Sequence, residues 1–409
     1  MPIDIPDFHY RYFHNPRAAG AVAYGERQRA VLSAEGCRAA RAEISTWPGY
    51  APTPLVDLPG LAKALGLGRV RYKDESRRFE LNSFKALGGA YAVMRLLIGE
   101  IERRKGISGV TSKDLLARTH ADVTGDITVT CATDGNHGRS VAWGARNFGC
   151  NCTIFIHATV SEGRKQAIER YGARVERVAG NYDDSIKHAA RAAAENGWFV
   201  VSDTSYEGYM DVPRDVMQGY TVMADEIVDQ LEGDGPSHLF VQGGVGGFPA
   251  AVISQFWETW GTDRPRAVVV EPDKAACIFE SMRQGHPTAV AGDLDTVMAG
   301  LACGEVSLLA WEILDQGADD VMEVSDAGVP ACMRLLARGA DGDPPLVAGE
   351  SAVAGLLGLI AAMRDPDVAG QLGLGPESDV LLIGSEGDTD PELYREIVGQ
   401  PGHNTRTAA

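Results

Sequence analysis

The sequence has little positive charge, no long apolar run and no metal-ligand pattern. Its 409 residues carry 38 lysines and arginines against 56 aspartates and glutamates, which gives a formal net charge of −18. Nucleic acids and anionic membrane surfaces select basic patches, so we expect neither as a partner. No run approaches the ~20 apolar residues of a membrane span, and the N-terminal "MPIDIPDFHYRYFHNPRAAG" lacks an apolar signal core. We expect a soluble, cytoplasmic protein.

Cysteine and histidine usage argues against two further classes. The seven cysteines are odd in number and scattered, which suits reduced thiols better than a disulfide framework. The nine histidines form no His-x-x-x-His pair, and no nearby histidine completes a zinc quartet with Cys150 and Cys152. We expect no metal site.

Short β-rich runs alternate with longer helical patterns, which predicts an α/β fold with mostly parallel open sheets. The predicted strands span 69–74, 126–133, 151–157, 174–179, 197–203, 238–242, 266–272 and 379–385. The predicted helices span 84–104, 137–148, 161–171, 182–196, 213–232, 248–260, 275–284, 325–338 and 350–363.

The length allows two α/β domains. We expect a large domain formed by 1–92 and 205–409 and a smaller domain formed by 93–204. The polar stretch 104–126 is interpreted as a surface excursion, and 400–409 as a flexible tail.

Four segments follow predicted strands at the edge where open α/β sheets bind ligands. The first is "ELNSFKALGG" (80–89). Ser83 is a suitable N-cap and places Lys85 in the first helical turn, where the helix dipole disfavours an ammonium ion. An uncharged lysine can form a Schiff base with an aldehyde. The alternative is a lysine that extends from the helix start into water.

The second segment is "FVQGGVGGFPAAV" (240–252), in which four glycines lie between a strand and a helix. Glycine lets backbone N–H groups converge at a helix N-terminus and bind an anion. The spacing matches neither Gly-x-x-x-x-Gly-Lys-Ser nor Gly-x-Gly-x-x-Gly, so a single phosphate is the expected ligand. A tight turn that only packs helix against sheet is the alternative.

The third segment, "CATDGNHGRSVAWGAR" (131–146), combines turn residues with a carboxylate and an amide. Asp134 either faces a ligand or only caps the helix, and we interpret His137 as a packed, hydrogen-bonded residue. In the fourth, "VLLIGSEGDTDPELYREIV" (380–398), a hydroxyl after a buried strand can face a ring nitrogen. An acidic turn ahead of a helix is the alternative there.

A lysine able to form a Schiff base and a glycine-rich loop able to bind one phosphate together suggest pyridoxal 5′-phosphate. The motifs "SFKALGGA", "DGNHGRSVAWGAR", "GGVGG" and "SEGDTDP" resemble those of the β-family (fold type II) pyridoxal-phosphate enzymes. That family has a tryptophan synthase β-like fold with the cofactor between its two domains. Within it, "RFELNSFKALGG", "TDGNHGR", "SDTSYEGY" and "EGDTDPELYR" resemble the diaminopropionate ammonia-lyase branch, in order from about residue 10 to 398.

The resemblance implies roles for the cofactor-binding residues. Lys85 is expected to form the Schiff base with the cofactor, and Asn136 to bind the pyridoxal 3′-oxygen. Ser385, or Thr389 as a second candidate, is expected to face the pyridine nitrogen. The loop expected to hold the phosphate comprises Gly243, Gly244, Val245, Gly246 and Gly247.

The resemblance also implies two catalytic carboxylates. Asp134 stands where dehydratases commonly have serine, and a carboxylate there is a competent base at neutral pH. Lys85 and Asp134 are then expected to take the α-proton of opposite enantiomers, so that both D- and L-substrates react. Asp203 is expected to hold or position the β-ammonium group of the substrate. The expected site for the substrate carboxylate comprises Thr133, Asp134, Gly135 and Asn136.

The expected reaction is α,β-elimination of 2,3-diaminopropionate to pyruvate and ammonia by a homodimer. A serine or threonine dehydratase, or a racemase, would share Lys85 and the glycine loop without needing either aspartate. A non-catalytic phosphate- or nucleotide-binding module is the alternative from a different class.

Overall fold

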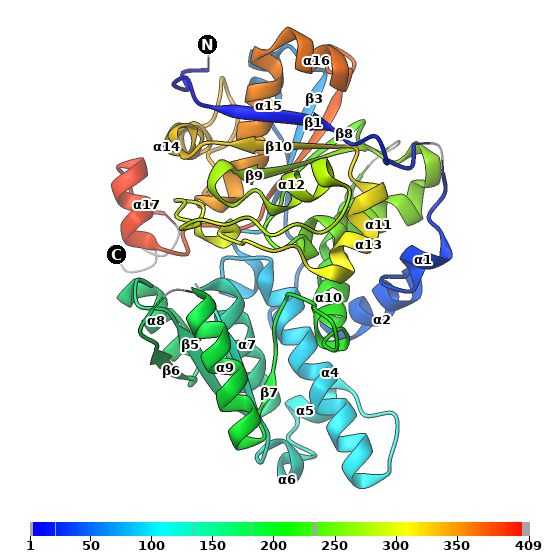
Figure 1. Cartoon of the computed structure of the whole chain (residues 1–409), viewed down its shortest axis with the longest axis vertical. Coiled ribbons are helices and arrows are strands. Elements are labelled where there is room, and N and C mark those ends of the chain that lie inside the picture. The colour runs from blue at the N-terminus through cyan, green and yellow to red at the C-terminus, as the bar shows by residue number, and fades with distance from the viewer. Residues whose placement is uncertain (1–2, 21, 134, 181, 232–234, 403–409) are drawn as a thin grey trace. The chain divides into compact units, whose positions relative to one another are not determined.

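The computed structural model describes residues 3–20, 22–133, 135–180, 182–231 and 235–402 (Figure 1). The strands are β1 (Tyr10–His14), β2 (Leu55–Asp57), β3 (Arg69–Asp74), β4 (Thr128–Ala132), β5 (Asn151–Ile156), β6 (Arg174–Arg177), β7 (Phe199–Val200), β8 (His238–Gln242), β9 (Arg266–Pro272), β10 (Asp320–Val324) and β11 (Asp379–Gly384). The helices are α1 (Glu26–Arg29), α2 (Ala34–Ile44), α3 (Pro59–Leu65), α4 (Lys85–Lys105), α5 (Ser112–Leu116), α6 (Ala121–Thr124), α7 (Asn136–Phe148), α8 (Glu162–Glu169), α9 (Tyr182–Asn196), α10 (Asp211–Gln230), α11 (Gly247–Trp260), α12 (Cys277–Gln284), α13 (Leu308–Gly317), α14 (Val329–Arg338), α15 (Ala354–Arg364), α16 (Pro366–Leu372) and α17 (Pro391–Val398).

The chain divides into two compact units. Unit 1 comprises Met1–Ser33, Pro52–Arg77 and Met223–Ala409, and unit 2 comprises Ala34–Ala51 and Arg78–Val222. The boundaries predicted at 93 and 204 lie inside unit 2 in this division, and the domain assignment itself stays a prediction. Residues 403–409 of the predicted tail lie outside the described residues.

Unit 1 contains a seven-stranded sheet in the order β1-β10-β9-β8-β11-β3-β2, which Figure 1 shows in part. The edge strands β1 and β2 are antiparallel to their neighbours, and the five inner strands are parallel. Inner parallel strands are covered on both faces, which is why β8 and β9 read as almost continuous apolar runs. A Cβ at Gly358 of α15 would lie 2.6 Å from Val270 Cγ2, so glycine lets this helix approach β9 closely.

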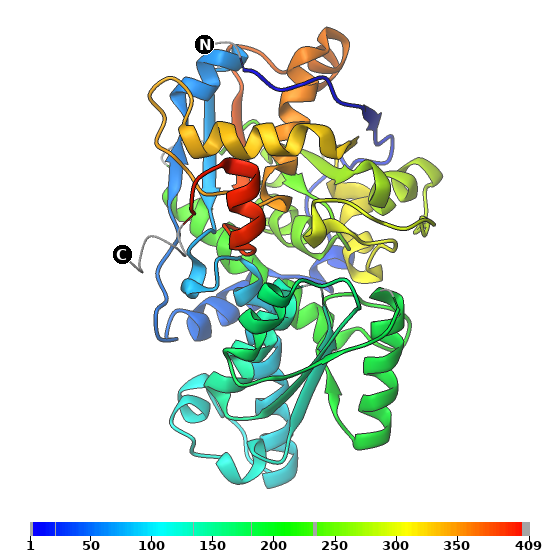
Figure 2. The same cartoon turned by 90° about the vertical axis from the view of Figure 1, so that its left-hand side faces the viewer.

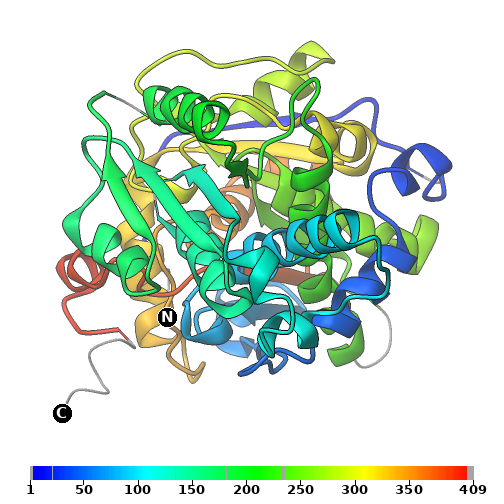
Figure 3. The same cartoon turned by 90° about the horizontal axis from the view of Figure 1, so that it is seen from below.

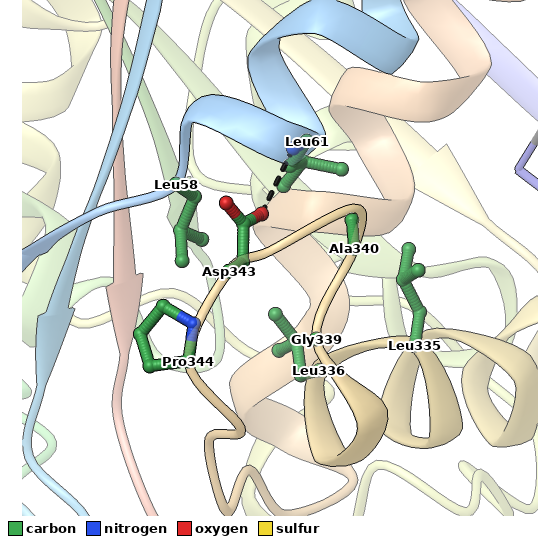
Figure 4. A pocket seen from close by; sticks show the side chains of 8 residues that line it. All are labelled: Leu58, Leu61, Leu335, Leu336, Gly339, Ala340, Asp343 and Pro344. Atoms are coloured by element: carbon green, nitrogen blue, oxygen red, sulfur yellow. Dashed lines mark hydrogen bonds between the residues drawn. The ribbon is translucent and has the colours of Figure 1, made fainter. Parts of the chain in front are cut away.

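Helices α17 and α3 make further contacts within unit 1. Helix α17 packs against α14, as Figure 2 shows. The loop after α14 carries Asp343, whose carboxylate accepts hydrogen bonds from Gly60 N at 2.6 Å and Leu61 N at 2.8 Å in the first turn of α3. Figure 4 shows the bond to Leu61. A small recess lined mainly by leucine, alanine and proline surrounds this cap.

Unit 2 contains a four-stranded parallel sheet in the order β6-β5-β4-β7. Helix α9 packs on one face of this sheet, and α7 and α8 pack on the other (Figure 3). Helix α4 packs on α7 at very short range, because a Cβ at Gly144 would lie only 2.8 Å from Ala90 Cα.

The interpretation of 104–126 as a surface excursion is wrong in part. Helices α5 and α6 form within it, and Ser112 and Leu115 of α5 are buried. Thr111 and Asp114 form a capping box at the start of α5, and Ser112 donates to Glu43 Oε2 through its N–H at 3.0 Å and its hydroxyl at 2.5 Å. A short polar helix is therefore fixed by contacts that its own periodicity does not reveal.

None of the helices within the described residues is long and apolar enough to cross a membrane. All seven cysteines are free thiols in this structure.

Candidate active site

Lys85 is the first residue of α4. The residue at the N-cap is Phe84, so the prediction that Ser83 caps the helix is wrong by one position. Ser83 still contributes, because its hydroxyl oxygen accepts the Lys85 N–H at 3.3 Å. The Lys85 carbonyl accepts a hydrogen bond from Ser140 of α7 at 2.6 Å, and Ser140 in turn accepts one from Ala90 N. These contacts fix the backbone from which the lysine side chain extends.

The ammonium group of Lys85 is paired with Asp203. Lys85 Nζ lies 2.5 Å from Asp203 Oδ2, and the two side chains are only 19% and 13% exposed. Burial is the largest single effect and acts to raise the pKa of Asp203, but the charge and hydrogen bond of Lys85, together with His137 and a backbone hydrogen bond, outweigh it and hold this pKa well below its usual range. Asp203 is therefore an anion throughout the neutral pH range.

His137 completes a cluster with this ion pair. Its Nε2 lies 2.8 Å from the Val201 carbonyl, which can only accept, so Nε2 carries the proton. Its Nδ1 lies 3.8 Å from Asp203 Oδ2 and is buried without a hydrogen-bond partner among the described residues. Burial lowers the pKa of His137, although Asp203 opposes the shift, so the ring is neutral at pH 7.

The topology of unit 2 brings the turn after β4 close to Asp203. Strands β4 and β7 are parallel neighbours, with Thr130 paired to Val200, so residues three positions further along lie at the same sheet edge. Within the turn, the Thr133 hydroxyl accepts hydrogen bonds from Gly135 N at 3.0 Å and Gly138 N at 3.1 Å.

Two residues shape the start of α7 at this turn. Gly135 has φ +157°, and α7 begins at Asn136, one residue before the predicted start. Arg139 donates to Asn136 Oδ1 at 2.6 Å, which turns the amide nitrogen of Asn136 away from the guanidinium. Asp134, the predicted base, lies outside the described residues.

The glycine loop of unit 1 follows β8 and ends in α11. Gly244 and Gly246 have φ of +69° and +92°, which L side chains rarely adopt. A Cβ at Gly243 would lie 2.5 Å from Glu271 Cγ, so this position has no room for a side chain. The loop thus presents bare backbone at the N-terminus of a 14-residue helix, a geometry that suits a phosphate.

Glu271 lies beneath this loop and was not identified from the sequence. It is fully buried at the end of β9, and its two oxygens accept hydrogen bonds from Ile278 N at 3.1 Å and Phe279 N at 2.7 Å. Burial raises the pKa of Glu271 to about 8, so the carboxyl group is mostly protonated and uncharged at pH 7. A negative charge beneath an anion site is thereby avoided.

Ser385 and Thr389 follow β11, which is the parallel neighbour of β8. Both side chains are buried in unit 1. Thr389 donates its hydroxyl proton to Glu386 Oε2 at 3.1 Å, whereas the Ser385 hydroxyl makes no hydrogen bond with any residue that the structure describes. Because parallel neighbours end at the same edge, the glycine loop and Ser385 lie at one edge of the seven-stranded sheet.

The predicted residues therefore form two groups, one in each unit. Lys85 and Asp203 meet in unit 2, near the turn that carries Thr133, Gly135 and Asn136. His137 is packed and hydrogen-bonded, as interpreted from the sequence, but its place beside Asp203 was not predicted. No group of three or more His, Cys, Asp or Glu side chains in the described part of the chain could hold a metal ion.

These features fit a phosphorylated aldehyde, and the comparison with known proteins gives the family. The model of the family described as "Pyridoxal-phosphate dependent enzyme" matches residues 46–384. The chain belongs to this family, its cofactor is pyridoxal 5′-phosphate, and the predicted fold type II architecture is confirmed. Membership does not favour the alternative of a non-catalytic phosphate-binding module.

Individual relatives are more specific. The chain is 39% identical over 363 residues to diaminopropionate ammonia-lyase of Escherichia coli (strain K12), a match that covers 87% of this chain and 89% of the relative. It is also similar to the crystal structure of the Escherichia coli enzyme in complex with D-serine, with a TM-score of 0.87, 34% identity and coverage of 97% of this chain and 98% of that chain. The crystal structure of that enzyme with an aminoacrylate-PLP azomethine reaction intermediate matches with a TM-score of 0.85 at the same identity and coverage.

Proposed function

We propose that this protein is a carbon–nitrogen lyase that converts 2,3-diaminopropionate and water to pyruvate and two molecules of ammonia. The pairing of Lys85 with Asp203 is the observation that carries the proposal, because it joins a potential base to a carboxylate able to bind a cationic substrate. The 39% identity to diaminopropionate ammonia-lyase supports the choice of substrate over serine or threonine.

The cofactor would supply an electron sink for the negative charge left when the α-proton of the substrate is removed. Lys85 would hold the cofactor aldehyde before substrate binds, and its freed amine would take the α-proton of one enantiomer. Asp134 is proposed as the base for the other enantiomer. Because the two bases would act from opposite faces, D- and L-diaminopropionate should both react.

Asp203 is proposed to bind the β-ammonium group of the substrate. Its carboxylate already holds one ammonium group, that of Lys85, at 2.5 Å, so a second amine of the same chemistry fits the same partner. The ammonium group of Lys85 lowers the pKa of Asp203 and keeps it anionic in this structure, and a substrate ammonium group in the same place would have the same effect. A leaving amine must depart protonated, and a carboxylate favours that charged form. Serine has a neutral β-hydroxyl and should react more slowly.

The remaining predicted residues would hold the other parts of the cofactor and substrate. Loop 243–247 would bind the phosphate through backbone N–H groups, and the turn 133–136 would bind the substrate carboxylate. Asn136 would donate to the pyridoxal 3′-oxygen, since Arg139 already occupies the amide oxygen. Ser385 is the better candidate to donate to the ring nitrogen, because Thr389 already donates to Glu386. A homodimer in the cytoplasm is part of the same proposal, and light scattering on the purified protein tests the dimer.

Product release from both enantiomers tests the function directly. Pyruvate and ammonia are measured with D- and L-diaminopropionate, D- and L-serine and threonine for the wild type, Lys85→Ala and Asp134→Asn. We expect a yellow protein whose visible band is abolished by borohydride, and turnover of both diaminopropionate enantiomers that Lys85→Ala abolishes. Asp134→Asn should impair one enantiomer selectively. Faster turnover of serine or threonine than of diaminopropionate would overturn the proposed substrate.

A further inference from the structure

A buried tyrosine hydroxyl beside Lys85 has no role in the chemistry above. Tyr220 of α10 is 1% exposed, and its hydroxyl makes no hydrogen bond of ordinary geometry with any residue in the described ranges. Leaving a buried hydroxyl unpaired is destabilising, so such a group calls for an explanation. Phenylalanine would fill the same space without that cost.

Packing holds the Tyr220 ring in place. A Cβ at Gly88 of α4 would lie 2.3 Å from Tyr220 Cε1, so the ring rests directly on the helix backbone. The Phe84 ring contacts Tyr220 edge to face, with centroids 4.7 Å apart. On α10, a Cβ at Gly219 would lie 2.3 Å from the Leu87 carbonyl oxygen, so α10 lies against α4 at this level. The ring therefore has little freedom to turn its hydroxyl elsewhere.

Both rings face the ammonium group of Lys85. Lys85 Nζ lies 5.7 Å from the Tyr220 ring centroid and 5.5 Å from that of Phe84, within the range of cation–π contacts. Burial raises the pKa of Tyr220, and Lys85 opposes the shift without reversing it. The hydroxyl therefore stays neutral. Among the described residues, the pKa values of Asp203 and His137 also respond to the Lys85 charge, and burial together with the Asp203 charge raises the pKa of Cys131.

Resting on the proposed roles of Lys85 and Asp203, we propose that Tyr220 is a positioning residue whose hydroxyl oxygen accepts an N–H of Lys85 while Asp203 is engaged by the substrate. The proton taken from the substrate makes Lys85 an ammonium ion when the β-ammonium group competes for the same carboxylate. A second carboxylate would hold the proton on Lys85 too firmly for onward transfer. A neutral hydroxyl orients the amine without that penalty.

The test replaces the hydroxyl and keeps the ring, in Tyr220→Phe. The matched control is Tyr72→Phe, since Tyr72 of unit 1 is equally buried and its hydroxyl also makes no hydrogen bond among the described residues. The readout is the pH dependence of Lys85 labelling by an amine reagent, followed by peptide mass spectrometry in full-length apoprotein that carries Asp203→Asn, so that no carboxylate holds the Lys85 amine. We expect the labelling midpoint to fall by about one pH unit in Tyr220→Phe, because the charged amine loses an acceptor. The midpoint should not move in Tyr72→Phe.

Steady-state kinetics of the holoenzyme provide the second readout. We expect kcat for diaminopropionate to fall about tenfold with KM within about twofold, as for an interaction made after substrate binding. An unchanged labelling midpoint, with or without a lower melting temperature, would overturn the proposal and leave Tyr220 a packing residue. If Tyr220→Phe does not fold, the Asp203→Asn apoprotein carrying 3-fluorotyrosine, whose oxygen is a weaker acceptor, should show the same direction of shift. Lack of pyruvate formation by the wild type would refute the proposed function, and the labelling result would stand apart from it.

Discussion

Glu271 offers a test of the electrostatics beneath the glycine loop. We predict that the free energy of unfolding of the wild type falls as pH rises from 5 to 8.5, and that Glu271→Gln removes much of this fall. The reason is that Glu271 is fully buried and is protonated in the folded protein at pH values where it is ionised in the unfolded chain. The amide of glutamine has similar volume and cannot ionise.

The size of the effect follows from the raised pKa. Between the ordinary value of 4.5 and the folded value of about 8, the native state binds one more proton than the unfolded state. Stability therefore decreases with rising pH in this window and is greatest below it. The pKa difference of 8 − 4.5 = 3.5 units, at about 1.4 kcal/mol per unit, sets an upper limit of about 5 kcal/mol on the fall in the free energy of unfolding. Because the surroundings of a buried carboxyl relax when it ionises, we expect about 2–4 kcal/mol.

The measurement is denaturant unfolding of apoprotein at several pH values, so that cofactor binding does not contribute. Glu271→Gln should be less stable than the wild type at pH 5, because the amide cannot accept from Phe279 N, and the two curves should converge towards pH 8.5. Glu377→Gln, at an exposed position of the same unit, controls for removing one charge and should run parallel to the wild type. If the free energies of unfolding of Glu271→Gln and the wild type changed in parallel with pH, burial would not raise the pKa of Glu271.

Three further substitutions test separate parts of the structure. Gly243→Ala should weaken cofactor binding about tenfold or more, because its methyl group would lie 2.5 Å from Glu271 Cγ. Absorbance titration of apoprotein with the cofactor measures this affinity, and Gly370→Ala, where a methyl group meets open space, is the control. Asp203→Asn should lower kcat/KM for diaminopropionate about 100-fold or more and that for serine much less, and equal losses in the two assays would contradict its role at the β-ammonium group. Asp343→Ala should lower the free energy of unfolding, measured in denaturant, by about 1–2 kcal/mol, because the N–H groups of Gly60 and Leu61 (the latter shown in Figure 4) lose their acceptor.

Three inner strands could be predicted with their bounds from the sequence, because burial on both faces leaves a continuous apolar run. β3, β8 and β9 have the predicted bounds 69–74, 238–242 and 266–272. The edge strand β1 was not predicted, since its sequence YRYFH is polar and aromatic and only its pairing with β10 makes it a strand. β10, with the sequence DVMEV, was also not predicted, because a buried aspartate and glutamate interrupt its apolar pattern. Both strands depend on partners that are distant in sequence.

The start of α4 shows the same limit at a single residue. The helix was expected from its composition, but its first residue depends on Phe84 adopting helical φ and ψ values, which no local rule for serine caps anticipates. Likewise, the need for glycine at positions 88 and 89, next to the lysine, depends on neighbouring helices. The structure shows that α10 and α7 lie so close that a Cβ at either glycine would come within 2.3 Å of a neighbouring side chain.

The protonation state of the Lys85 amine depends on two opposing electrostatic effects, of which only the helix dipole could be recognised from the sequence. A helix N-terminus disfavours an ammonium ion by about 0.3–1 kcal/mol, whereas a charge-assisted hydrogen bond to a carboxylate favours it by about 1.5–3 kcal/mol. With Asp203 at 2.5 Å the second effect is larger, so an undisturbed Lys85 amine keeps its proton. The adjacency of β4 and β7, which positions Asp203, could not be read from a chain in which β5 and β6 lie between them. A substrate with a β-ammonium group would compete for Asp203 and favour a neutral Lys85, so the carboxylate that selects the substrate would also activate the base.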